Sequence, residues 1–161
     1  MNRKVLAAAA AAAAALALQG CMTAGSSSPR TECDGSAEAN RRIVLAFYNA
    51  GLVGRQPQTA FMRYMAPDFV EHKPDVPEGT RQATAAFLSQ IIVEVPGAKW
   101  EIIRTIAEGD MVFLHARFTP AEGAPPYALA DIFRVKGCKI AEHWDVVAPP
   151  AKEQRNPNPR F

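Results

Sequence analysis

The chain has few histidines and cysteines, and their spacing matches no metal-binding motif. Its 161 residues include three histidines and three cysteines, with no His-x-His, His-x₃-His or Cys-x₂-Cys pattern. The ten glycines are dispersed, so there is no glycine-rich loop to cradle a phosphate and no Gly-x-Ser-x-Gly turn to expose a nucleophilic serine. We therefore expect neither a metal nor a cofactor.

The first twenty residues have the pattern of a secretion signal. Arg3 and Lys4 precede an unbroken apolar run over residues 5–18, which is shorter than a membrane-spanning helix requires. The sequence Leu18-Gln19-Gly20-Cys21 that ends this run resembles a bacterial lipobox. The resemblance implies that residues 1–20 are removed and that Cys21 is lipidated. An ordinary secretion signal followed by an incidental cysteine is the alternative.

The residues that follow the signal predict a tethered protein of the cell envelope. Residue 22 is methionine rather than aspartate, and by resemblance to the lipoprotein sorting rule this favours the outer membrane, facing the periplasm. Residues 21–35 are rich in serine and glycine, which predicts a flexible tether. In an oxidising compartment Cys33 and Cys138 can form a disulfide; the alternative is two unpaired cysteines in flexible segments.

The remainder of the chain lacks an excess of charge of either sign. The whole chain has 18 Lys and Arg against 16 Asp and Glu, and residues 1–20 contain two of the basic residues, so 16 of each remain in the other 141 residues. No basic stripe is left to bind nucleic acid. This length fits one domain with a core of its own, which we place at residues 36–148, followed by a proline-rich tail at 149–161.

Apolar spacing predicts helices first and strands afterwards. Residues recur at helical spacing after Ser36, after Pro57 and after Thr80, whereas residues 99–148 alternate as strands do. This order is typical of an α+β domain. The predicted helices cover residues 36–52, 58–66 and 80–95; the predicted strands cover 69–72, 100–106, 111–118, 130–134 and 140–147.

The last two predicted strands contain ionisable residues among aromatic and β-branched ones. Asp131, His143 and Asp145 are expensive to bury without partners, so they indicate a cavity or a hydrogen-bonded network. If residues 136–138 form a three-residue turn, Asp131 lies opposite His143 and on the same face as Asp145. If only residues 137–138 form the turn, Asp131 lies on the opposite face from His143 and Asp145. We favour the first register, because Tyr127, Leu129 and Phe133 then complete an apolar pocket.

The chain contains four motifs, Phe69-Val70-Glu71-His72-Lys73-Pro74, Ala107-Glu108-Gly109-Asp110, Asp131-Ile132-Phe133-Arg134 and Glu142-His143-Trp144-Asp145. Together they resemble the SnoaL-like branch of the NTF2-like superfamily, over residues 40–147. The resemblance implies an α+β cone, in which about three N-terminal helices pack on a curved antiparallel β-sheet that encloses a pocket, and a homodimer formed through the outer sheet face.

The resemblance also implies a chemistry without metal or cofactor. SnoaL-like polyketide cyclases use an aspartate on the last strands as acid/base in an aldol condensation, and Asp145 is the matching position. We therefore expect a small apolar or carbonyl ligand and an enzyme of the aldol, cyclase or isomerase type, with a non-catalytic, lipid-anchored binding or dimerisation module as the alternative. The candidate catalytic residues are Asp145, Asp131, His143 and His72; the candidate pocket residues are Tyr64, Trp144, Phe133, His115 and Tyr127.

Structural roles are the competing interpretation of these residues. Asp131 could pair with Arg134 or Arg117 and do nothing else. A histidine within a strand, such as His143 or His115, is commonly structural.

Overall fold

A computed structural model describes residues 33–161 of the chain. The predicted signal, the predicted lipidation site Cys21 and most of the predicted tether lie outside the described residues. The helical elements are α1 (Ala37–Tyr48), the π-helical turn η1 (Asn49–Val53), α2 (Pro57–Tyr64), the 3₁₀ turn η2 (Pro77–Gly79) and α3 (Arg81–Glu94). The strands are β1 (Met65–Glu71), β2 (Lys99–Glu108), β3 (Met111–Thr119), β4 (Tyr127–Lys136) and β5 (Lys139–Ala148).

The helices begin at the residues that the sequence predicts. Ser36 caps α1 by accepting a hydrogen bond from the Ala39 amide, and Thr80 caps α3 in the same way from the Ala83 amide. Pro57 occupies the first turn of α2, where its missing N–H costs nothing. The helix predicted over residues 36–52 becomes α1 followed by η1, because a wider turn replaces the α-helical one after Tyr48.

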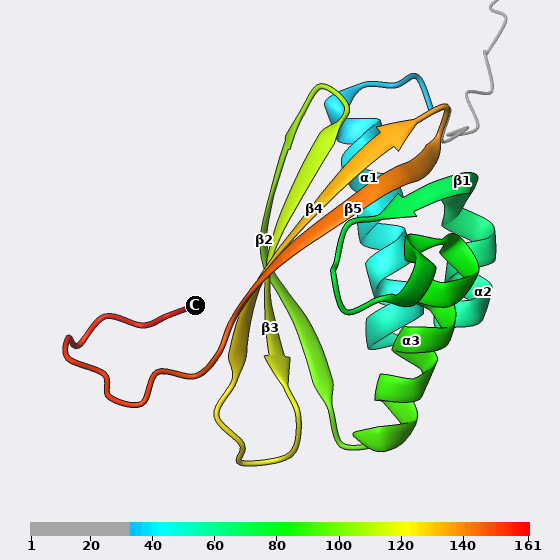
Figure 1. Cartoon of the computed structure of the whole chain (residues 1–161). Helices are drawn as coiled ribbons and strands as arrows, with labels where there is room; N and C mark the ends of the chain where they lie inside the picture. The colour runs from blue at the N-terminus through cyan, green and yellow to red at the C-terminus, as the bar shows by residue number, and fades with distance from the viewer. Residues whose placement is uncertain (1–32) are drawn as a thin grey trace, which may run out of the picture. The chain divides into compact units, whose positions relative to one another are not determined.

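The five strands form one sheet in the order β1-β5-β4-β3-β2, with the three helices on one of its faces (Figure 1). Strands β2 to β5 pair antiparallel, as predicted. Strand β1 differs from the prediction, because it pairs in parallel with β5 and makes the sheet mixed. A parallel pair needs a long connection, and here α3 and β2 to β4 lie between the two strands.

The β4–β5 hairpin has a shorter turn than predicted, but its three ionisable residues share one face of the sheet, as predicted. Lys136 pairs with Lys139, so the turn has two residues, Gly137 and Cys138, rather than three. The two-residue turn alone would pair Asp131 with Trp144, but a bulge at Ala141 shifts the register by one, so that Asp131 pairs with Asp145. The predicted partner was His143. Asp131, His143 and Asp145 therefore share one face although the turn is the shorter one.

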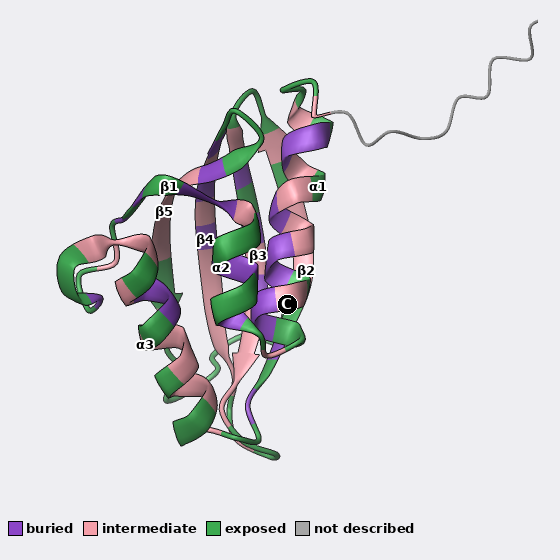
Figure 2. Ribbon diagram, turned by 90° about the vertical axis from the view of Figure 1, so that its right-hand side faces the viewer, coloured by how far each residue is buried: buried purple, intermediate pink, exposed green. Residues whose placement is uncertain are grey.

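The core lies between the helices and the inner face of the sheet, where Figure 2 shows the buried residues of α1 turned toward the strands. Phe47 contacts Phe61 and Phe133 edge to face, with ring centroids 5.1 and 6.0 Å apart. Helix α3 buries only Thr84 and Ala85 fully. It therefore covers the sheet less closely than α1 does.

A disulfide and the C-terminal tail tie both ends of the described chain to the domain. Cys33 and Cys138 form a disulfide with a Cα–Cα distance of 5.7 Å, which joins the segment before α1 to the β4–β5 turn. The tail, residues 149–161, has no regular structure and lies on the face of the sheet away from the helices (Figure 1). Its last residue, Phe161, stacks on His115 and lies under the guanidinium of Arg117.

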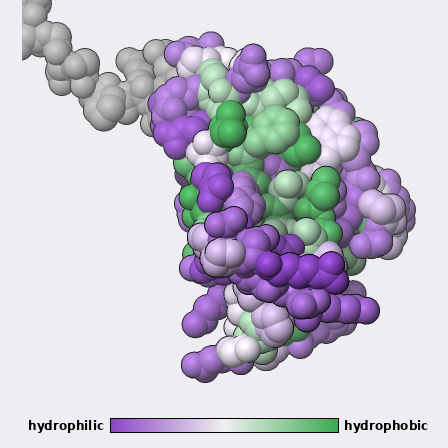
Figure 3. All heavy atoms as spheres, turned by 90° about the vertical axis from the view of Figure 1, so that its left-hand side faces the viewer, coloured by the Kyte–Doolittle hydropathy of each residue, from purple (hydrophilic) through white to green (hydrophobic). Residues whose placement is uncertain are grey.

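The outer face of the sheet bears a group of exposed apolar side chains, bordered by polar ones (Figure 3). Ile106, Phe113 and Val146 are among them, with 68%, 43% and 61% of their surfaces exposed. None of the helices within residues 33–161 is long and apolar enough to span a membrane.

Candidate active-site cavity

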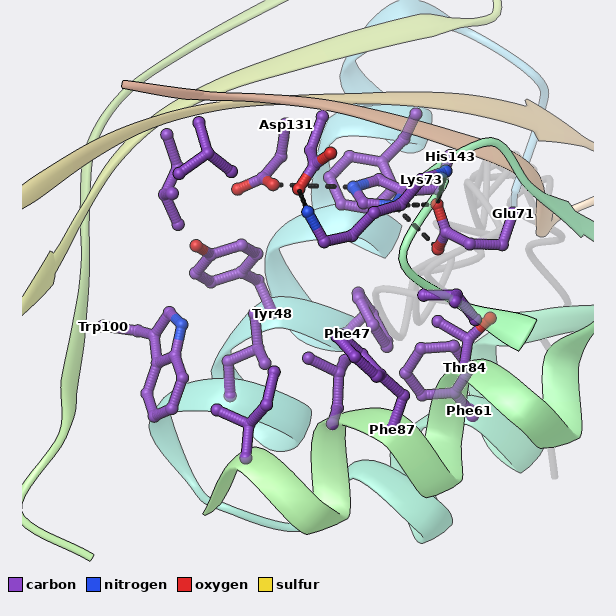
Figure 4. Close-up of a pocket in the computed structure, with 18 of the residues that line it drawn as sticks. Phe47, Tyr48, Phe61, Glu71, Lys73, Thr84, Phe87, Trp100, Asp131 and His143 are labelled. Carbon is purple, nitrogen blue, oxygen red and sulfur yellow. Dashed lines mark hydrogen bonds and ion pairs between the residues drawn. The ribbon is translucent and has the colours of Figure 1, made fainter. Parts of the chain in front are cut away.

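A cavity of about 230 Å³ lies between the inner face of the sheet and the helices. Figure 4 shows its two walls: Asp131, His143, Lys73 and Glu71 lie on one side, and aromatic rings that include Tyr48 and Trp100 lie on the other. A mostly apolar hollow with a few convergent polar groups is the usual form of a small-molecule site. The remaining lining residues are Phe47, Leu52, Phe61, Met65, Phe69, Val76, Thr84, Phe87, Leu88, Ile91, Phe118, Tyr127, Leu129, Phe133, Asp145 and Val147.

Three buried groups form a chain of charges in the polar wall. Glu71 and His143 are paired positions of the parallel β1–β5 ladder, and His143 Nδ1 lies 2.9 Å from each carboxylate oxygen of Glu71. On the other side of the ring, His143 Nε2 lies 3.5 Å from Asp131 Oδ1. The imidazole also stacks on Phe133, its partner across β4 and β5, with ring centres 4.6 Å apart.

The two carboxylates decide the protonation state of His143. Burial by itself would lower the pKa of this imidazole, but hydrogen bonds to Asp131 and Glu71, together with their charges, raise the pKa to about 9. At neutral pH His143 is therefore an imidazolium held between two acidic side chains. Its orientation and its charge are both fixed by these partners.

A second ion pair lies beside the first. Lys73, in the loop after β1, places its Nζ 2.9 Å from Asp145 Oδ2 and 3.3 Å from Asp75 Oδ2. Burial would lower the pKa of Lys73, but hydrogen bonds to Asp145 and Asp75, together with the charges of these carboxylates, outweigh it and raise the pKa. Lys73 thus stays cationic at neutral pH and balances the charge of Asp145.

Two polar atoms of the cavity have no hydrogen-bond partner within the described part of the chain. They are the hydroxyl of Tyr48, a residue with 0% exposure, and Oδ2 of Asp131, which is 6% exposed. Figure 4 shows the Tyr48 hydroxyl turned toward the Asp131 carboxylate. Burial raises the pKa of Tyr48 well above 10, and the charge of Asp131 raises it further, so Tyr48 keeps its proton and can donate it in a hydrogen bond.

Five of the predicted site residues line the cavity: Asp131, His143, Asp145, Phe133 and Tyr127. The structural alternative for Asp131 is wrong, because Arg134 pairs with Asp110 and Glu142, and Arg117 pairs with Glu101. Asp131 contacts the buried His143 instead.

The predicted roles of His72 and Trp144 in the cavity are wrong. These two rings stack on each other, with centroids 4.4 Å apart and planes 7° apart, and His72 Nε2 lies 3.1 Å from Glu142. Strand alternation explains the error: Glu71 and His143 face the cavity, so their neighbours His72 and Trp144 face the other side of the sheet.

His115 and Tyr64 also lie outside the cavity. His115 is on the outer face of β3, beneath Phe161, because its neighbours Leu114 and Ala116 fill the core. The ring of Tyr64, at the end of α2, packs edge to face against Phe47 at 6.5 Å and forms the border of the core. Neither residue is among those that line the cavity.

Sequence reasoning missed Glu71, Lys73 and Tyr48. Alternation from the buried Phe69 would have placed Glu71 and Lys73 on the inner face and His72 on the outer one. Tyr48 lies four residues after Val44, on the buried stripe of α1, and this spacing was a signal for it.

No group of three or more metal-ligating side chains with the geometry of a metal site occurs among residues 33–161. The charged residues of the cavity are joined to one another instead, as Glu71–His143–Asp131 and Lys73–Asp145. Proton transfer is one chemistry that side chains arranged in this way can perform.

Comparisons with known proteins agree with this fold. The model of the SnoaL-like domain matches residues 44–143, whereas a search among curated proteins finds no match. The solved structure of TsrD from Streptomyces laurentii is similar with a TM-score of 0.57 and 20% identity, over 68% of this chain and 88% of TsrD.

Two further solved structures are similar to the same extent. AclR from Streptomyces galilaeus, a proposed hydroxylase, has a TM-score of 0.59 and 21% identity over 70% of this chain and 81% of its own. A proposed polyketide cyclase from Acidithiobacillus ferrooxidans has a TM-score of 0.56 and 18% identity over 67% of this chain and 87% of its own. The predicted α+β fold, with helices packed on a curved sheet around a pocket, is confirmed.

Proposed function

The chain belongs to the SnoaL-like domain family, and on that premise we propose that it is a cofactor-independent enzyme performing acid/base chemistry on a small carbonyl compound. The observation that carries the proposal is the combination, in one apolar cavity, of two paired aspartates, Asp131 and Asp145, with a buried imidazolium and a buried tyrosine hydroxyl. Ionisable groups in an apolar site are typical of proton-transfer catalysis.

In the proposed reaction Asp145 is the base. Its carboxylate takes a proton from the carbon next to the substrate carbonyl, and the electron pair of that C–H bond moves into the enolate. The Tyr48 hydroxyl donates a hydrogen bond to the oxygen on which negative charge develops. In an aldol step the enolate carbon then attacks a second carbonyl, and the protonated Asp145 returns its proton to the new alkoxide, so no net proton or electron is gained.

The other charged groups act in this scheme as positioning residues. Lys73 holds one oxygen of Asp145 at 2.9 Å and balances its charge. His143, fixed by Glu71, holds one oxygen of Asp131 at 3.5 Å and leaves the other free beside Tyr48. Pre-organised charges of this kind need not rearrange during a reaction, and this lowers the free energy of the transition state.

A second candidate function is that of a ligand-binding module without catalysis. It is favoured by one observation: each charged side chain that lines the cavity has a partner of opposite sign within 3.5 Å. A network in which every charge has a partner can stabilise and shape a binding pocket without taking part in catalysis.

Exchange of carbon-bound hydrogen for deuterium separates the two candidates. The full chain is incubated in D₂O with a panel of cyclic ketones, 1,3-diketones and lactones, and loss of the α-proton signals is followed by NMR. The wild type should accelerate exchange for at least one compound, and Asp145→Asn should lower that rate by about 10²- to 10⁴-fold. Asp110→Asn, at an exposed carboxylate that pairs with Arg134 outside the cavity, is the matched control.

Equal rates for Asp145→Asn and the wild type would remove Asp145 as the base. Binding of the panel compounds with exchange no faster than in buffer would favour the non-catalytic module.

We further propose that the domain works in the bacterial envelope, tethered through Cys21 and facing the periplasm from the outer membrane. The disulfide between Cys33 and Cys138 supports this, because such bonds persist in oxidising compartments. Globomycin treatment of expressing cells tests the lipid anchor, since accumulation of the uncleaved precursor is expected only for a lipoprotein.

The predicted homodimer also stays a proposal. The exposed apolar side chains Ile106, Phe113 and Val146 on the outer sheet face support it. Sedimentation of the full chain over a range of concentrations tests it, and a monomer at every concentration would contradict it.

A further inference from the structure

The cavity contains an acceptor and a donor that both lack a partner. Asp131 Oδ2 and the Tyr48 hydroxyl face each other across the cavity wall, but neither makes a well-formed hydrogen bond with any described residue, and both are buried. Leaving a buried polar group unpaired is unfavourable, and more so when the group is charged. Because both groups border a hollow large enough for a small molecule, a bound molecule can satisfy the two of them together.

The charges of the cavity limit what that molecule can be. Its lining includes three carboxylates, Glu71, Asp131 and Asp145, but only two cations, Lys73 and His143. The cations are engaged, because Lys73 contacts Asp145 and Asp75, and His143 contacts Glu71 and Asp131. A ligand carboxylate would add a second uncompensated negative charge to an apolar site, which is strongly unfavourable.

The Tyr48 hydroxyl and Asp131 Oδ2 also favour some neutral ligand groups over others. A ketone oxygen accepts a hydrogen bond from Tyr48 but has no proton for Asp131. An ether or an alkyl group satisfies neither residue fully. A hydroxyl satisfies both, because its oxygen accepts from Tyr48 while its proton is donated to Asp131.

We propose that the cavity binds a neutral, largely apolar molecule through one hydroxyl held between Tyr48 and Asp131, and that it rejects molecules bearing a carboxylate. Alcohols, phenols and enols belong to this class. The inference rests on the proposed function in one respect only: if the ligand is also the substrate, it is an enolisable carbonyl compound, and its enol is the form that both residues can hold. Binding itself needs no turnover.

Three probes with the same apolar body test the proposal: 4-propylphenol, propylbenzene and 4-propylbenzoate. Their binding to the full chain at pH 7 is measured by calorimetry and by NMR shifts of cavity residues. The wild type should bind 4-propylphenol about tenfold more tightly than propylbenzene, since a hydrogen bond to a charged acceptor is worth about this much. It should bind 4-propylbenzoate at least about tenfold more weakly than propylbenzene.

Two variants assign the effect to the two residues. Tyr48→Phe keeps the ring and should remove most of the preference for the phenol while leaving the affinity for propylbenzene unchanged. Asp131→Asn removes one negative charge and should reduce the discrimination against the benzoate by about tenfold. Asp110→Asn, outside the cavity, should leave all three affinities as they are.

Three results would overturn the proposal: tighter binding of the benzoate than of the phenol by the wild type, an equal change for all three probes in Tyr48→Phe, or no binding of any probe. The outcome is independent of the exchange assay. Selective binding of the phenol without α-proton exchange on any ketone would refute the proposed chemistry and support the ligand class. Exchange that depends on Asp145, together with preferred binding of the benzoate, would support the proposed chemistry and refute the ligand class.

Discussion

Asp131 and Asp145 face each other directly across the β4–β5 ladder, and each has a cation of its own. His143 contacts Asp131 at 3.5 Å, and Lys73 contacts Asp145 at 2.9 Å. Like charges on directly paired positions of a sheet destabilise it, so the two cations are what makes this pairing tolerable. The positions of both cations depend on the end of β1, because Glu71 is its last residue and fixes His143, and Lys73 lies in the loop that follows.

The stability of the domain should depend on pH through His143. Its pKa is about 9 in the folded domain and 6.5 in the unfolded chain, so the stabilisation is complete below pH 6.5 and is lost as the pH rises through 9. One pKa unit corresponds to about 1.4 kcal/mol, and the free energy of unfolding should fall by about 3 kcal/mol across this window. Urea denaturation at pH 6 and pH 9.5 measures the difference.

Two histidine variants provide the controls for this pH dependence. His143→Gln should lose most of the difference, whereas His72→Gln, at the exposed histidine beside Glu142, should keep it. A difference that persists in His143→Gln would mean that another group titrates.

Removing the carboxylate of Glu71 should release His143. Glu71→Gln leaves the imidazolium with Asp131 alone, so the pKa of His143 should fall and the domain should lose about 3–5 kcal/mol, as expected when one partner of a buried ion pair is removed. NMR titration of the His143 ring and urea denaturation measure the two effects. Glu142→Gln, at the partly exposed partner of Arg134 and His72, should cost less than about 1 kcal/mol. Similar effects of the two variants would contradict a special role for Glu71.

Gly79 should tolerate alanine less well than Gly109. Both residues have positive φ, +61° and +56°, so both variants bear a backbone cost of about 1–2 kcal/mol. At Gly79 the new Cβ would also lie 2.8 Å from the carbonyl oxygen of Glu71, whereas at Gly109 it would meet nothing within 4 Å. We expect Gly79→Ala to be less stable than Gly109→Ala by at least about 1 kcal/mol and to shift the NMR signals of His143. Equal melting temperatures would show that the end of β1 adjusts freely.

The disulfide should stabilise the domain measurably. The double variant Cys33→Ser/Cys138→Ser opens a loop with a sequence separation of 105 residues and should lower the free energy of unfolding by about 2–4 kcal/mol. Thermal melting with and without dithiothreitol checks this. The reductant should bring the wild type to the melting temperature of the double variant and leave the variant itself unchanged. An unchanged wild type under reduction would contradict the expected contribution.

The sequence predicts most of the elements, because apolar spacing and end residues such as Ser36 and Thr80 are local signals. It does not predict that β1 pairs in parallel with β5, because that pairing depends on how distant segments meet. Glu71 and Lys73 were missed although their alternation with Phe69 was a local signal for the inner face. The motif drew attention to His72, which has the more familiar chemistry but faces the other side.

In the β4–β5 hairpin the predicted turn was wrong, but the predicted face of Asp131 was right. The sequence offers two registers for Gly137 and its neighbours, and the structure combines the shorter turn with a bulge at Ala141. A bulge of this kind depends on the packing of the whole strand. Turn residues alone therefore could not indicate it, whereas the apolar face formed by Leu129 and Phe133 did place Asp131 correctly.

The bond between Cys33 and Cys138 closes a covalent ring around nearly the whole domain. The exposed connection between β3 and β4, at residues 121–123, lies within this ring. A protease that cuts there once would open the ring without releasing a fragment, and the two pieces would migrate apart only after reduction. Both walls of the cavity would remain joined by the disulfide, so a nicked molecule should keep the cavity intact.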